Sequence, residues 1–93
     1  MQPFSGGLSI IELLNPVSFK WRTDAKNDLG LNAEDVAEVE PLLVTRNAKG
    51  EVEEVKQANM LAVFINAFRQ QQQQIDALKK LLCQQNPQAD ICR

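Results

Sequence analysis

The stretch from Ala58 to Gln85 contains no proline and carries a repeat of seven residues. Such repeats are typical of coiled-coil helices, which bury the first and fourth residues of each heptad against a neighbouring helix. At 1.5 Å per residue, this helix would be about 40 Å long and would extend beyond the small head that precedes it. The sequence therefore predicts a long C-terminal helix with an apolar face that needs a partner. The interface residues are Leu61, Phe64, Phe68, Gln71, Ile75, Leu78 and Leu82, followed by Gln85 in the last heptad.

Five consecutive glutamines, residues 70–74, interrupt this apolar face between Phe68 and Ile75. Only Gln71 falls at a heptad position, and the other four fall on the flanks. We interpret the run as one polar layer of a coiled coil, which costs stability but can fix register or strand number. Two alternatives are that the helix folds back on its own head with the same face, and that the glutamine tract is flexible. The heptads do not determine the number of strands.

The residues before the long helix predict a small α+β head. Leu8, Ile11 and Leu14 have helical spacing, which ends at Asn15-Pro16. The segment "VSFKW", residues 17–21, alternates apolar and polar side chains as a half-buried strand does, and the polar residues after it predict a loop. Trp21 is then either a core or subunit-interface residue, or a binding aromatic.

A short strand and a second helix follow. Asn32 is placed to cap this helix, Leu31 and Val36 are placed as a hydrophobic staple, and Pro41 ends it. Two further strands flank a turn that contains Gly50, where a positive φ is often needed. The fold class is therefore α+β, a head of short strands and helices followed by a long C-terminal helix. We divide the chain into the head (1–57), the coiled-coil helix (58–86) and a tail that folds back (87–93).

Size and charge restrict the classes of partner. Ninety-three residues allow one small domain with a limited core. A net charge of −2 argues against nucleic acid as a partner, since proteins that bind it are usually strongly basic. No apolar run approaches the roughly 20 residues of a membrane span, and the N-terminus lacks the features of a signal peptide. The abrupt start at Met1 suggests a piece of a longer protein.

The chain has no histidine and two cysteines, Cys83 and Cys92, so we expect no metal site and no cofactor. The cysteines lie nine positions apart across an Asn-Pro turn, and an intrachain disulfide would stabilise the fold by about 2.5–3 kcal/mol on the chain-entropy model. Free thiols in a reducing compartment and disulfides between chains are the alternatives. An intrachain bond would imply an oxidising location, such as an extracellular particle or a cell surface.

Four segments resemble, in order, the endosialidase-type C-terminal intramolecular chaperone domain found at the ends of phage tail spikes and tail fibres. They are "IIELLNPVSFKWR", "GLNAEDVAEVEPLLV", "GEVEEV" and "LAVFINAFRQQQQQIDALKKL". The resemblance covers about residues 8–82 and implies a homotrimer whose three long helices hold three upstream fibre or spike chains in register. It also implies a virion tail or cell surface as a location. Holding three chains together makes their later contacts effectively intramolecular.

The same family usually cleaves itself with a Ser-Lys pair in a Ser-Asp-x-Arg-x-Lys stretch, whose lysine must be neutral to act as a base. Here Ser5 is followed by two glycines, and Ile10 stands in the lysine's place. Ser9 is no better, since Leu14 stands five residues after it, and Lys20 is expected on a strand surface. We assign no catalytic residue and expect any such stretch upstream of Met1. The alternatives to a chaperone module are an autoprotease with that stretch present and a stand-alone coiled-coil adaptor.

Overall fold

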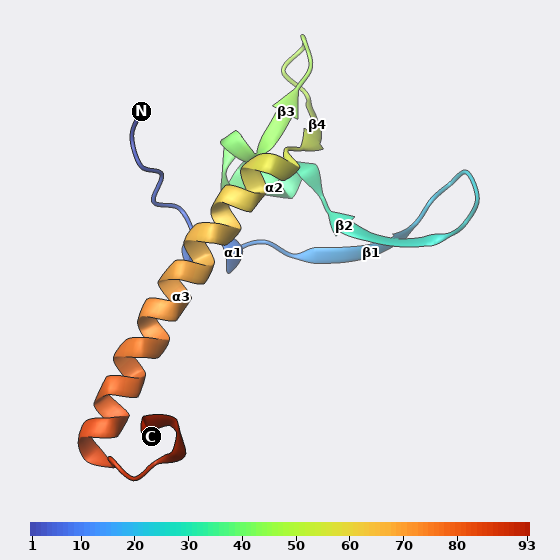
Figure 1. The fold of residues 1–93 in the computed structure, drawn as a ribbon. Helices are drawn as coiled ribbons and strands as arrows, with labels where there is room; N and C mark the ends of the chain where they lie inside the picture. The colour runs from blue at the N-terminus through green and yellow to red at the C-terminus, as the bar shows by residue number, and fades with distance from the viewer.

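The computed structural model describes all residues from Met1 to Arg93 and confirms the predicted α+β fold. A small head is followed by one long helix that runs away from it, so the molecule measures 58 × 39 × 18 Å (Figure 1). In chain order the elements are α1 (Leu8–Ile11), β1 (Pro16–Lys20), β2 (Asn27–Leu31), α2 (Ala33–Val39), β3 (Val44–Arg46), β4 (Val52–Val55) and α3 (Gln57–Gln85). Short 3-10 turns cover Pro41–Leu43 and Asp90–Cys92.

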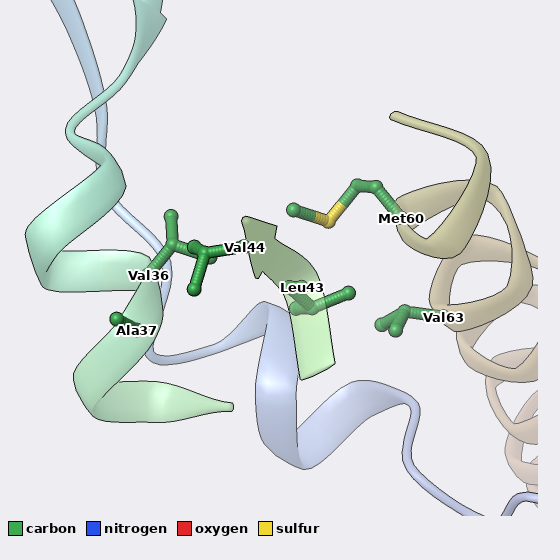
Figure 2. Packing of buried hydrophobic residues seen from close by; sticks show 6 residues of the cluster. All are labelled: Val36, Ala37, Leu43, Val44, Met60 and Val63. Carbon is green, nitrogen blue, oxygen red and sulfur yellow. The ribbon is translucent and has the colours of Figure 1, made fainter. Parts of the chain in front are cut away.

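The core is a single cluster of six buried apolar residues between α2, β3 and the first turns of α3 (Figure 2). Leu43 lies in its middle, between the side chains of α2 and those of α3 (Figure 2). The cluster consists of Val36, Ala37, Leu43, Val44, Met60 and Val63. Only six residues of a chain of 93 form this core. Burial of each large apolar side chain contributes about 1.5–3 kcal/mol, so the total stabilisation from burial is small. Most of the large apolar side chains remain exposed as a result.

Helix α2 has the predicted cap. The Asn32 side-chain oxygen accepts hydrogen bonds from the backbone N–H groups of Glu34 (2.9 Å) and Asp35 (3.4 Å), which the first turn of the helix leaves unpaired. Leu31 packs against the cluster that contains Val36, as the predicted staple requires. The helix ends at Val39, before Pro41, because proline disfavours helix in the residue that precedes it.

Strands β3 and β4 pair antiparallel, as predicted, around a turn at residues 47–50. The Asn47 side-chain oxygen accepts from the backbone N–H groups of Lys49 (2.9 Å) and Glu51 (3.0 Å). Gly50 has φ of +82°, a conformation that glycine adopts without a Cβ penalty. The turn is therefore built by the two residue types that favour it most.

Strands β1 and β2 form a second antiparallel hairpin, which differs from the prediction in two respects. Strand β2 begins at Asn27, so the connecting loop is shorter than expected. The prediction of a half-buried strand is wrong for this chain alone, because all five residues of β1 are exposed. The hairpin projects from the head (Figure 1), and only its base, at Gly30 and Leu31, is half-buried. Trp21 follows the end of β1, is 50% exposed, and is therefore not a core residue.

Helix α3 begins and ends within one residue of the predicted limits. The backbone N–H of Asn86 donates to the carbonyl oxygen of Leu82 (2.7 Å), and Pro87 stops the helix. Only Met60, Val63 and Ala67 of this helix are buried, all of them in its first three turns. The C-terminal half of α3 extends away from the head, and the chain after it turns back towards the end of the helix (Figure 1).

Candidate interface on the long helix

The predicted interface residues lie on one exposed face of α3, which we call the heptad face. It consists of Leu61, Phe64, Phe68, Gln71, Ile75, Leu78 and Leu82. The six apolar members are between 39% and 71% exposed, and Gln71 is exposed as well. Large apolar side chains that remain exposed along one helix face often mark an interaction site.

The head covers a different face of α3. Met60, Val63 and Ala67 point into the head, and at about 100° per residue their stripe is centred roughly a quarter of a turn from the heptad face. The structure therefore does not bury the heptad face against its own head, as one alternative required. The glutamine run is continuous α-helix, so the flexible-tract alternative is not what the structure shows.

The apolar surface continues from the heptad face onto the head. Two open hollows adjoin Phe64, and both are also lined by Gly30 and Leu31. One extends along α3 to Leu61 and the other extends under β1 and α1. Their remaining lining residues include Ile11, Leu14, Pro16, Leu29, Val55 and Met60. A helix docked on the heptad face would reach these hollows at its head-proximal end.

The β1–β2 hairpin adds exposed aromatic side chains. The rings of Phe19 and Trp21 meet edge to face with centroids 5.0 Å apart. The indole Nε1 of Trp21 donates to Asp28 Oδ2 (2.8 Å), and the backbone N–H of Leu29 donates to Asp28 Oδ1 (2.8 Å). These two bonds, that of Trp21 first, hold the pKa of the Asp28 carboxyl below its ordinary value because they favour the charged form. Side-chain contacts thus fix Trp21 although it is exposed.

Asn66 and Gln70 have a role that the sequence analysis missed. Both side chains bind the backbone of the N-terminal segment, Phe4–Leu8, which lies beside α3. Gln70, which the sequence places on a flank of the coiled coil, thus faces the head. A helical projection that placed Asn66 and Gln70 on the same side as Val63 and Ala67 could have suggested such contacts.

The two cysteines lie at the far end of α3. Cys83 and Cys92 form a disulfide with their Cα atoms 5.6 Å apart, and no cysteine is free. The 3-10 turn at Asp90–Cys92 packs on the end of the helix. The tail, residues 87–93, thus folds back within one chain.

No catalytic pair is visible around the two candidate serines. The carbonyl oxygen of Ser5 accepts from Gln70 Nε2 (3.1 Å), and Ser9 lies exposed on α1. Lys20 is the last residue of β1, on the projecting hairpin. No group of three or more acidic or cysteine side chains comes together in a way that could hold a metal ion. None of the helices combines the length and apolar character that a membrane span requires.

Residues 1–45 match the family model described as chaperone of endosialidase. This part of the chain is similar to the endosialidase chaperone family. The match confirms the resemblance drawn from the sequence, and the family's name indicates a chaperone role. The endosialidase chaperone match spans α1, the β1–β2 hairpin, α2 and the start of β3, whereas α3 lies outside it. No curated protein and no solved structure matches the chain.

Proposed function

We propose that this chain is a trimerisation and intramolecular chaperone module. It registers three copies of an upstream fibre or spike chain and assists their folding, and it has no catalytic activity of its own. One observation carries the proposal: the heptad face is exposed over its whole length while the head covers a neighbouring face of the same helix.

The physical benefit of such a module is entropic. Three separate chains that start an intertwined fold must first meet, whereas chains tethered side by side make their later contacts at high effective concentration. The heptad face, from Leu61 to Leu82, gives the tether about six turns of contact. The family resemblance, rather than the heptads, supports three strands.

The two hollows beside Phe64 support the same role. A second copy that covered the heptad face would also cover the adjoining apolar surface of the head, where Leu31 and Leu29 lie beside the helix. The exposed aromatic residues of the hairpin add to the surface available to further copies. In that case residues of the head would also form part of the interface between copies.

The molar mass of the purified chain in solution tests the proposal. The chain has a mass of 10.4 kDa, so a homotrimer has three times that value, about 31 kDa. Light scattering should give this mass at micromolar concentration and without any added protein. A monomer that associates only with a different protein would instead indicate the adaptor, and a folded, inert monomer would refute both.

Self-cleavage is tested separately, on a chain that includes the residues preceding Met1. Cleavage that depends on a serine and a lysine in those residues would support the autoprotease alternative. Cleavage that required Ser5 or Ser9 would contradict the statement that this chain is non-catalytic.

A further inference from the structure

Asn66 and Gln70, one turn apart on α3, form four hydrogen bonds with the N-terminal segment. Asn66 Nδ2 donates to the carbonyl oxygens of Phe4 (2.6 Å) and Gly6 (2.9 Å). Gln70 Nε2 donates to the carbonyl oxygen of Ser5 (3.1 Å), and Gln70 Oε1 accepts from the backbone N–H of Leu8 (2.9 Å). We call these two side chains the amide clamp.

All four hydrogen bonds of the amide clamp go to backbone atoms of the segment. The clamp therefore constrains the path of the chain and not the side chains that the segment carries. Gln70 uses its amide as donor and acceptor at once, towards Ser5 and Leu8, and so it ties two separate points of the segment to one side chain.

Gly7 is what lets the segment lie so close to the helix. It is buried, and a Cβ atom added there would lie 2.7 Å from Gln70 Oε1 and 3.0 Å from the backbone nitrogen of Ala67. The second of these atoms belongs to the helix backbone and cannot move aside. A Cβ at position 7 would therefore crowd both Gln70 and the helix backbone, and the segment or the clamp would have to shift.

Helix α1, which follows the segment directly, also packs on α3. The chain from Phe4 to Ile11 is therefore attached to the long helix at two consecutive places. A flexible segment of seven residues would instead have a root-mean-square end-to-end distance of about 15 Å. The positions of three such segments would then vary too much to keep the alignment of the helices.

We infer that Asn66 and Gln70 are positioning residues that fix the N-terminal segment on α3 and so pass the register of the helices to the chain that leads into this domain. The passing of register rests on the proposed function, whereas the fixing of the segment does not. The clamp supplies a direct connection between the glutamine run and the chaperone role.

The test compares the double variant Asn66→Ala/Gln70→Ala with wild type and with Gln74→Ala. Gln74 lies one turn beyond Gln70 in the same helix, is exposed, and its side chain makes no hydrogen bond, so it is a matched control. Alanine is the best helix former, and neither change should weaken α3. Gly7→Ala is a second variant, which keeps both amides but adds a methyl group that crowds Gln70 Oε1 and the helix backbone.

Two readouts are needed. The first is hydrogen exchange of the Leu8 backbone N–H by NMR, with that of Val63 as an internal reference. The second is the distance between nitroxide labels on Gln2→Cys in the assembled protein, with Cys83 and Cys92 kept oxidised. Fixation predicts a narrow distance distribution in wild type and in Gln74→Ala.

In the double variant and in Gly7→Ala, exchange at Leu8 should be at least tenfold faster while Val63 is unchanged. The label distribution should become at least twice as broad at an unchanged molar mass. Exchange at Leu8 within twofold of wild type in both variants would overturn the inference, as would labels that stay narrowly spaced. If wild type is a monomer, the proposed function fails, and the exchange at Leu8 alone decides whether the clamp fixes the segment.

Discussion

At the scale of single residues, polar side chains fix the path of the backbone in several places. Asn32 caps α2, Asn47 closes the β3–β4 turn, and Asn66 and Gln70 hold the N-terminal segment. Such bonds contribute about 0.5–1.5 kcal/mol each, which is substantial beside a core of six residues. In this chain, hydrogen bonds from side-chain amides and in local turns add stability that a larger hydrophobic core would otherwise provide.

The Asp28 carboxylate shows how one residue links pH to local structure. Its pKa is lowered in the folded hairpin, so its bond to Trp21 stabilises the hairpin above the ordinary aspartate pKa of about 4. This contribution should be lost as the pH falls through the lower, folded-state pKa. Trp21 is the only tryptophan, and its fluorescence should therefore change with a midpoint below pH 4. The change should disappear in Asp28→Asn and persist in Asp24→Asn, and a midpoint above that value would contradict the structure.

Leu43 is the residue on which the core depends most. It is 2% exposed and lies between α2 and α3. Leu43→Ala should lower the free energy of unfolding by about 2–5 kcal/mol, because it removes buried methyl groups and leaves a cavity. Leu42→Ala, next to it but 62% exposed, should change it by less than about 0.5 kcal/mol. Urea denaturation at one fixed protein concentration measures both, and equal losses would show that Leu43 is not the centre of the core.

At the scale of elements, the structure separates two faces of α3 that the sequence analysis treated as one. The predicted limits of α3, the cap of α2 and the Gly50 turn are confirmed because each depends on neighbouring residues, whose types favour one local conformation. The exposure of β1 could not be predicted in the same way, because alternation in "VSFKW" shows which side chains share a face but not whether anything covers that face. Asn66 and Gln70 were missed for a similar reason: their partners lie about 60 positions away.

Phe68→Asp tests the heptad face. In the proposed assembly each helix would carry this carboxylate at the same layer. The like charges would be buried side by side and would repel one another, so the oligomer should dissociate to monomers. Gln73→Asp places the same charge outside the heptad positions and should leave the molar mass unchanged. Light scattering of both variants decides the matter, and an intact Phe68→Asp oligomer would remove this layer from the interface.

Gln71→Leu tests the polar layer. An apolar side chain at this position should raise the melting temperature of the proposed assembly. A buried amide layer lowers the stability of a coiled coil, and its benefit is to fix the register or the number of strands. Scanning calorimetry gives the melting temperature and light scattering the strand number. A clear fall in the melting temperature would mean that the glutamine layer itself stabilises the assembly.

At the scale of the whole molecule, the chain is a small head on a rod whose far end is closed by a disulfide. Because the Cys83–Cys92 bond lies within one chain, a reducing agent should leave the molar mass unchanged. It should lower the melting temperature, since the bond contributes about 2.5–3 kcal/mol on the chain-entropy model. Cys83→Ser/Cys92→Ser should behave as the reduced wild type does, and a fall in mass on reduction would show that disulfides join the copies.

Met60 and Val63 belong to the rod by secondary structure and to the head by packing. Truncation of the chain at residue 57 would therefore remove two members of the hydrophobic cluster. A fusion of the globular part to an unrelated coiled coil would have to keep the first three turns of α3. Heating should accordingly melt globule and helix stem in one cooperative step. A substitution that unwinds the upper stem would thereby also unfold the globule that rests on it.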